Sequence, residues 1–271
     1  MTTSLPFEGA GPTPYPDVNG VLRGLIPRVM AALGEQFRGI YLFGSLVSGD
    51  FDPRRSDVDV LGVVDDVLSA ERFAALSGVH RDLAASKSPW AVEVEAYYLT
   101  EAALRREDPS FGCHLKVNRG NGGVLEPLHR DRGWLIQGHL LREFGVALVG
   151  PDPRTLIAPV APGDLRRTIA ASAPEWLAAL LADPTELRRS GSHTYLVLTL
   201  CRVLYTLAND AVASKQVAGR WAQAELGDRW AALIGSALAW RKDLPTREIA
   251  EGDFAETVEL LRFVLARCRG S

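Results

Sequence analysis

The chain has 271 residues, of which 47% are hydrophobic and 23% charged, and its formal net charge is −3. This length fits one large domain or two modest ones, and the composition excludes a largely disordered chain. The small negative charge argues against a nucleic-acid partner and is compatible with a cationic small molecule. The apolar stretches are too short for a membrane span and Met1 is not followed by a signal-peptide pattern, so we expect a cytoplasmic protein.

The first half of the chain alternates helical and strand patterns. Residues 1–20, rich in proline and glycine, are expected to form a loose arm, and apolar residues at helical spacing follow. The segments "FRGIYLFGS" and "SDVDVLGVV" predict two strands, and "WAVEVEAYYL" predicts a third after a second helix. Turn-forming residues between Asp108 and Gly133 predict a long loop or hairpin. Helix, strand, strand, helix, strand is an α/β pattern.

Four prolines between Gly150 and Asp164 mark the best candidate boundary, because strand patterns disappear after them. From Asp164 onward several stretches have helical periodicity, which is typical of a helical bundle. We therefore predict an α/β (α+β) domain over residues 1–155 and an all-α helical bundle over residues 156–271. The bundle explains most of its Leu, Ala and Trp positions as core, and the tryptophans assigned to it are Trp176, Trp221 and Trp230.

Asp57 and Asp59 lie one residue apart at the start of the second predicted strand, and they share a face because side chains alternate. Two adjacent carboxylates repel each other and lose hydration when partly buried, so they need a compensating cation. Mg²⁺ fits, because it takes few carboxylates and completes its coordination with water and substrate phosphates. Glu93 and Glu95, on one face of the third strand, could complete the metal site or accept a proton from an attacking hydroxyl.

The turn Gly44-Ser45 precedes the two aspartates. Small residues in a turn let backbone N–H groups approach phosphate oxygens, and a serine hydroxyl adds a donor. An isolated Asp-x-Asp is more often a solvated strand face than a metal site. The order of strand, Gly-Ser, short loop, "SDVD" and later "VEVE" favours a phosphate-transfer site.

The segment "GSLVSGDFDPRRSDVDVLGVV" resembles the nucleotidyltransferase signature, a Gly-Ser followed by Asp-x-Asp on the next strand. Two further segments, "HLLREFGVALVGPDP" and "LVLTLCRVLYTLANDAVASKQVAGRWAQAEL", resemble the streptomycin/spectinomycin adenylyltransferases of that superfamily. The likeness covers most of the chain. It implies a nucleotidyltransferase domain followed by a helical domain that closes the active-site cleft. It also implies transfer of AMP from ATP to a hydroxyl of a cationic aminoglycoside or aminocyclitol, spectinomycin and/or streptomycin, with release of pyrophosphate.

The resemblance implies roles for individual residues. Gly44 and Ser45 would hold the triphosphate, while Asp57 and Asp59 would bind two Mg²⁺ ions that bridge the phosphates. Glu93 falls where the family has its catalytic glutamate, as the base and a further metal ligand, with Glu95 as second choice. Three positions of the helical domain match residues that reach the nucleotide from across the cleft: Arg202, Lys215 and Trp240.

The acceptor side departs from the known resistance enzymes. They hold their drugs with a tryptophan after the third strand and acidic residues before the "LTL" helix, where this chain has "FGCHL" and "GSHTYLVLTL". Losing a carboxylate partner for a charged guanidinium or amine weakens a desolvated contact, so spectinomycin or another hydroxylated metabolite competes with streptomycin as the acceptor. The candidate acceptor contacts are His114, Ser192, His193 and Tyr195.

Two alternatives stay open at the level of the sequence. A nucleotidyltransferase of the same fold could act on another acceptor, a metabolite or a protein, or the chain could be a non-catalytic nucleotide-binding regulator. The intact Asp57, Asp59 and Glu93 argue against the regulator, since binding alone does not need a general base. We expect a monomer, because a two-domain cleft enzyme needs no partner to complete its site.

Overall fold

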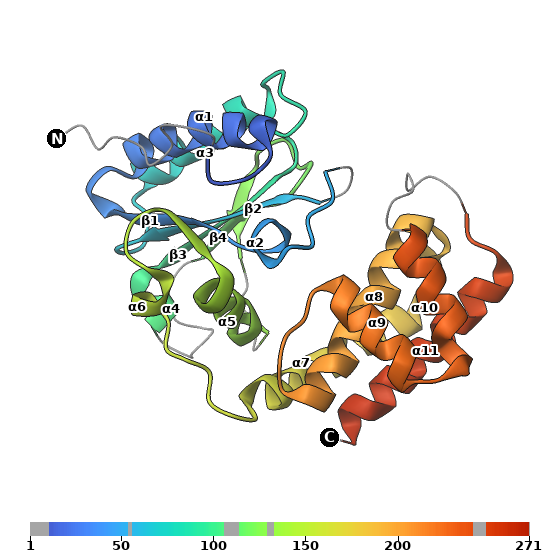
Figure 1. Ribbon diagram of the computed structural model, residues 1–271. Helices are drawn as coiled ribbons and strands as arrows, with labels where there is room; N and C mark the ends of the chain where they lie inside the picture. The colour runs from blue at the N-terminus through green and yellow to red at the C-terminus, as the bar shows by residue number, and fades with distance from the viewer. Residues whose placement is uncertain (1–10, 54–55, 106–113, 129–132, 241–247, 271) are drawn as a thin grey trace. The chain divides into compact units, whose positions relative to one another are not determined.

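The computed structural model describes residues 11–53, 56–105, 114–128, 133–240 and 248–270 (Figure 1). The chain divides into two compact units between Pro159 and Val160. The first combines a sheet with helices, and the second is helical in its described part. The predicted fold class is therefore confirmed. No helix among the described residues has the length and hydropathy that crossing a membrane requires.

A six-stranded sheet forms the centre of the first unit, in the order β5-β4-β3-β2-β1-β6. The pair β2 and β3 is parallel, and the other neighbouring strands pair antiparallel. The predicted hairpin after Asp108 is confirmed by the pairing of β4 with β5. The strands are β1 Phe37–Leu42, β2 Val58–Val64, β3 Val94–Thr100, β4 Leu115–Val117, β5 Leu125–Pro127 and β6 Val146–Val149.

Helices cover both faces of this sheet (Figure 1). Because side chains alternate along a strand, Ile40 of β1 packs with the helices of one face and Tyr41 with those of the other. The first face carries α1 Pro16–Leu33 and α3 Ala70–Ala84; the second carries α5 Trp134–Phe144 and α6 Pro153–Leu156. Two short helices begin soon after strands end, α2 Ser45–Ser48 after β1 and α4 Glu101–Arg105 after β3.

The first helix begins earlier than predicted. We expected a loose arm over residues 1–20, but α1 begins at Pro16, a residue favoured at the first helical position. The Asn19 side chain is fully buried, accepts hydrogen bonds from the Thr13 N–H (3.1 Å) and hydroxyl (2.8 Å), and donates to the Thr13 carbonyl (2.7 Å). This anchor orders the segment before the helix, and its proline- and glycine-rich composition concealed it. Residues 1–10 of the expected arm lie outside the described residues.

The second unit packs its helices around α8, whose buried residues include Leu200 and Cys201. Trp230 belongs to this core, while Trp176 and Trp221 are partly buried against it. The predicted helical periodicities are confirmed in all the described segments. The helices are α7 Asp164–Ala182, α8 Ser190–Asn209, α9 Lys215–Glu225, α10 Asp228–Trp240 and α11 Glu251–Arg269.

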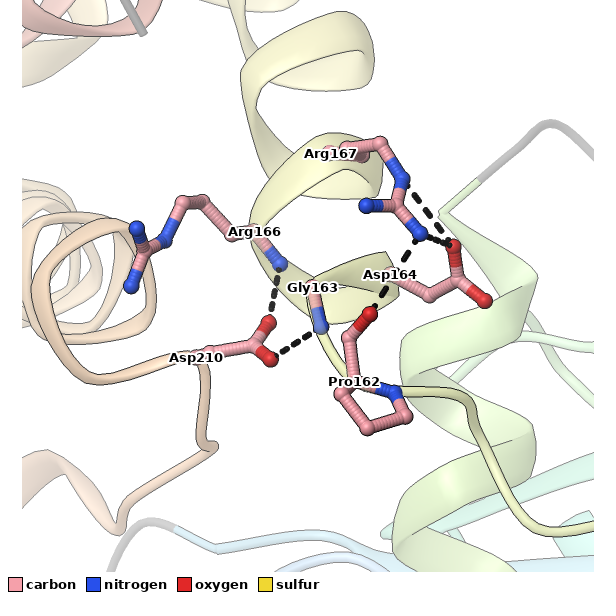
Figure 2. Close-up of polar contacts among 6 residues, drawn as sticks. All are labelled: Pro162, Gly163, Asp164, Arg166, Arg167 and Asp210. Carbon is pink, nitrogen blue, oxygen red and sulfur yellow. Dashed lines mark hydrogen bonds and ion pairs between the residues drawn. The ribbon is translucent and has the colours of Figure 1, made fainter.

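The start of α7 is held by a residue that is distant in sequence (Figure 2). The carboxylate of Asp210, which follows α8, accepts hydrogen bonds from the backbone N–H groups of Gly163 and Arg166, the latter at 2.9 Å. The first N–H groups of a helix have no partner within it, so Asp210 caps α7 from outside. These backbone hydrogen bonds lower the pKa of Asp210.

Candidate active site

Three carboxylates meet where β2 and β3 begin. Asp57, Asp59 and Glu95 each offer an oxygen within 4.8 Å of the other two, and all three residues are half-buried. The parallel register of β2 and β3 places Asp59 opposite Glu95, and Asp57 directly precedes β2. The two aspartates of the "SDVD" motif therefore lie together, and a glutamate of the "VEVE" motif joins them.

The electrostatics of this acidic group favour a bound cation. Burial raises the pKa of Glu95, and the nearby charge of Asp57 raises it further, whereas a 2.9 Å hydrogen bond from the Tyr97 hydroxyl opposes the rise. Like charges this close favour the neutral form unless a cation compensates them. Oxygen donors in this number suit Mg²⁺, which leaves its other positions to water and phosphate. The acidic group therefore fits the predicted metal.

Glu93 lies outside this group. It directly precedes β3, its carbonyl accepts a hydrogen bond from the Val58 N–H at 2.9 Å, and its carboxylate forms an ion pair with Arg119. The sequence ranked Glu93 before Glu95 as the third carboxylate, whereas Glu95 is the glutamate that lies with Asp57 and Asp59 among the described residues; the metal-ligand role of Glu93 stays a prediction. The physical reason is that the register of β2 with β3 places Glu95 opposite Asp59, while the Glu93 carboxylate forms an ion pair with Arg119.

Gly44 and Ser45 form a tight turn against the acidic group. Gly44 has a φ of +67°, and a Cβ on it would lie 1.9 Å from Oδ2 of Asp59. Only glycine allows both this backbone conformation and this approach. The Ser45 hydroxyl is buried and makes no hydrogen bond to any described residue. A turn with close backbone and a spare hydroxyl beside carboxylates suits a phosphate held with a metal ion.

The predicted nucleotide contacts of the second unit lie on three helices. Arg202 is half-buried within α8, Lys215 is the first residue of α9, and Trp240 is the last of α10. The Lys215 ammonium lies 4.4 Å from the centre of the Tyr195 ring, a cation–π contact. The side chain of Trp240 lies outside the described residues. Lys215 is thus beside a predicted acceptor contact, which the sequence did not indicate.

The four predicted acceptor contacts differ in exposure. Ser192 and Tyr195 line a pocket of about 560 Å³ in the second unit, and Tyr195 is 61% exposed. His193, on the same helix, is fully buried, and burial lowers its pKa. His114 precedes β4 in the first unit and is only 5% exposed. Exposure therefore favours Ser192 and Tyr195 over both histidines as contacts for a ligand.

The pocket also has a lining that the sequence assigned only to packing. Trp176, which we predicted to be core, contributes to it together with Leu180, Leu187 and Leu196. Glu186 adds a carboxylate to this largely apolar wall. An aromatic ring and an acid in one pocket suit a cationic ligand with an apolar face.

Comparisons with known proteins show the family to which this chain belongs. Residues 29–102 match the nucleotidyltransferase domain family, and residues 155–267 match the family described as aminoglycoside adenylyltransferase, C-terminal domain. An aminoglycoside (3'') (9) adenylyltransferase from Klebsiella pneumoniae is 30% identical over 239 residues, which cover 82% of this chain and 82% of that protein. This chain belongs to the aminoglycoside adenylyltransferase family. It is therefore an enzyme, a nucleotidyltransferase, and the alternative of a non-catalytic regulator is not supported.

Two further matches of this adenylyltransferase are proteins named for the adenylylation of spectinomycin. A spectinomycin 9-adenylyltransferase from Staphylococcus aureus is 29% identical over 224 residues, covering 76% of this chain and 81% of that protein. The solved structure of a spectinomycin adenylyltransferase from Enterococcus faecialis with ATP and spectinomycin matches with a TM-score of 0.69. That match covers 92% of this chain and 98% of the other at 18% identity, and it shows a shared fold.

The sequence analysis did not identify two basic residues that lie near the acidic group of this adenylyltransferase. Lys116 on β4 lies close enough to Glu95 for its charge to oppose the rise in the pKa of Glu95, and Arg119 pairs with Glu93. Both come from the segment that we predicted only as a loop or hairpin. The antiparallel pairing of β4 with β3 brings them to the acidic strand ends. Nothing in the spacing of "KVNRGNGG" predicts that pairing.

Proposed function

We propose that this enzyme transfers AMP from ATP to a hydroxyl of spectinomycin or streptomycin and releases pyrophosphate. The observation that carries the proposal is the acidic group of Asp57, Asp59 and Glu95 packed against the Gly44-Ser45 turn. The acceptor class is supported by relatives that are named for spectinomycin and for aminoglycosides. We further propose a monomer that has a small-molecule acceptor and no nucleic-acid partner.

In this proposal Asp57 and Asp59 hold two Mg²⁺ ions, with Glu95 as the third carboxylate of the acidic group. Bound Mg²⁺ would neutralise charge on the phosphates and on the attacking and leaving oxygens. The backbone of Gly44 and the free hydroxyl of Ser45 bind the triphosphate. Holding the phosphates in one orientation makes attack on the α-phosphorus effectively intramolecular, which lowers the barrier.

Glu93 is our proposal for the general base, and Glu95 is its rival. A base has to be close to the metal-bound phosphate and keep an oxygen available for the acceptor proton. The hydrogen bond from the Val58 N–H, between Asp57 and Asp59 in sequence, keeps Glu93 beside the acidic group. Glu93 takes the proton of the acceptor hydroxyl, whose oxygen bonds to the α-phosphorus as the bond to pyrophosphate breaks.

The second unit contributes the remaining contacts of the proposal. Arg202, Lys215 and Trp240 bind the nucleotide, as the family resemblance implies. Ser192 and Tyr195 are the preferred acceptor contacts because of their exposure, while the buried His193 and His114 act through packing. The two domains of this proposal are those predicted from the sequence, residues 1–155 and 156–271, and the boundary between the compact units lies four residues later, between Pro159 and Val160.

The test is pyrophosphate release from ATP and Mg²⁺ with spectinomycin, streptomycin and other aminoglycosides. Wild type is compared with Asp57→Ala, Glu93→Gln and Glu95→Gln, and ATP binding is measured in parallel. We expect turnover with at least one drug and none in Asp57→Ala. Glu93→Gln should bind ATP without turnover. A Glu95→Gln variant that alone behaves this way would move the base to Glu95, and wild type that binds ATP but modifies no drug would overturn the acceptor class.

A further inference from the structure

We propose that Arg119 is a positioning residue for Glu93, delivered by the glycine-rich turn between β4 and β5. This inference rests on the proposed function, in which Glu93 accepts the proton of the acceptor hydroxyl. The role is to fix the orientation of the Glu93 carboxylate, which lies at the strand ends where Asp57, Asp59 and Glu95 also meet.

The contact itself is a charge-assisted pair. Nε of Arg119 lies against Oε2 of Glu93, and the two side chains are 42% and 27% exposed. A fully exposed ion pair would contribute little, but partial burial strengthens the attraction. The guanidinium is planar and always charged, so it fixes the orientation of a carboxylate as well as its charge. The Glu93 carboxylate keeps enough exposure to meet a substrate.

The turn that carries Arg119 is anchored next to Glu93. The Gly120 N–H donates to the Val92 carbonyl at 2.9 Å, so a backbone hydrogen bond joins the residue after Arg119 to the residue before Glu93. This hydrogen bond holds the backbone at Gly120 next to the backbone at Val92. The ion pair therefore does not depend on a long flexible reach of the arginine side chain.

Side-chain and backbone geometry hold the rest of the turn. Oδ1 of Asn121 accepts from the N–H groups of Gly123 (3.0 Å) and Val124 (3.1 Å), and its amide donates to the Val124 carbonyl at 2.8 Å. Gly123 has a φ of +76°, and a Cβ on it would lie 2.2 Å from the His80 carbonyl oxygen of α3. The turn therefore contacts α3 through Gly123 and is hydrogen-bonded to Val92 through Gly120.

The charges at the strand ends explain why an ion pair between Arg119 and Glu93 is useful. Asp57, Asp59 and Glu95 are already close together, and the backbone hydrogen bond from the Val58 N–H holds Glu93 at the same strand ends. Like charges repel, so an unpaired Glu93 carboxylate would turn away from the other three and lose a defined orientation. Arg119 gives Glu93 a different partner and reduces the excess of negative charge.

The experiment compares steady-state kinetics of Arg119→Ala, Arg119→Lys and Arg28→Ala with wild type, using the antibiotic that the wild type modifies. We expect Arg119→Ala to lower kcat by about tenfold to a hundredfold, with little change in KM for ATP, because a misplaced catalytic group costs rate rather than affinity. Arg119→Lys should recover part of the loss, and added guanidinium chloride at low concentration should partly restore Arg119→Ala. Arg28 forms a partly exposed ion pair with Asp82 at 2.5 Å in the same unit, and its loss should leave kcat unchanged.

The outcomes separate this inference from the proposed function. A wild-type chain without turnover would overturn the proposed function, and the positioning role with it. An active wild type with unimpaired Arg119→Ala, or with a loss confined to the KM for ATP, would overturn the positioning role alone. Thermal unfolding of each variant accompanies the kinetics. A loss of kcat that guanidinium restores in a normally folded Arg119→Ala supports the role.

Discussion

Gly44 and Asp59 approach each other so closely that a Cβ on residue 44 would lie 1.9 Å from Oδ2 of Asp59. The backbone joins the same two segments, since the Phe43 N–H donates to the Asp59 carbonyl at 3.3 Å. The Gly44-Ser45 turn and the acidic group are therefore in direct contact, and moving either one displaces the other.

Gly44→Ala should abolish turnover. The new methyl group must displace the Asp59 carboxylate, and a φ of +67° with a ψ of −145° is a backbone conformation that essentially only glycine adopts, so alanine there costs about 1–3 kcal/mol. The matched control is Gly49→Ala, because Gly49 also has a positive φ (+76°) but nothing lies within 4 Å of its Cβ position. Urea unfolding and pyrophosphate release measure the two effects. Gly49→Ala should lose less stability, because Gly49 is in the left-handed helical region (ψ 14°) that other residues can adopt, and only Gly44→Ala should lose activity. Equal activity in the two variants would contradict the steric argument.

Mg²⁺ should raise the melting temperature of the wild type and not that of Asp59→Asn. Without a cation, Asp57, Asp59 and Glu95 repel one another, so Asp59→Asn should be at least as stable as wild type in EDTA. Adding Mg²⁺ should reverse this order, since a ligand that binds the folded state stabilises it. Asp66→Asn, at an exposed carboxylate, is the control and should respond to Mg²⁺ like wild type. An equal Mg²⁺ response in Asp59→Asn would show that the ion binds elsewhere.

The sequence was sufficient for features set by local pattern. Alternation along "SDVDV" placed Asp57 and Asp59 on one face, and helical periodicity identified α7 through α11. The choice between Glu93 and Glu95 was different in kind. Alternation predicts both glutamates on one face, and which of them meets Asp59 depends on the register of β2 with β3 and on the ion pair that Glu93 forms with Arg119. No pattern within one strand contains that information.

The same limit applies to contacts between distant segments. Asp210 caps a helix whose first residue is Asp164, and Lys215 lies over the ring of Tyr195. Each contact joins residues of different helices, so it depends on how the helices pack. The local composition of "NDAVASK" predicts a turn there but not the partner of its aspartate.

Removal of the Asp210 cap should destabilise the second unit. Asp210→Ala removes the hydrogen bonds to the Gly163 and Arg166 N–H groups and also places alanine at a φ of +50°, for a combined cost of about 2–3 kcal/mol. Asp210→Gly tolerates the backbone angle and loses only the cap, at about 1 kcal/mol. Asp210→Asn keeps an oxygen acceptor and the backbone preference and should be the mildest. Urea unfolding would contradict the cap if Asp210→Gly were as stable as wild type.

The buried pair of His80 and Tyr98 should make stability depend on pH. Nε2 of His80 lies 2.7 Å from the Tyr98 hydroxyl, both side chains are buried, and burial, with a smaller effect of Arg28, lowers the pKa of His80 from 6.5 to about 4. In the unfolded chain the histidine takes up its proton near pH 6.5, whereas the folded state excludes that proton until about pH 4. The unfolded state therefore binds more protons between these values, and the free energy of unfolding falls as the pH is lowered through this window. The contribution is complete above pH 6.5, and about 2 kcal/mol of it is lost between pH 7 and pH 5.

His80→Gln stays neutral and can still hydrogen-bond to Tyr98, so its free energy of unfolding should decline less steeply over the same range. Urea unfolding at pH 7, 6 and 5 measures both slopes, and parallel slopes for wild type and His80→Gln would mean that His80 takes up its proton in the folded state at its ordinary pKa.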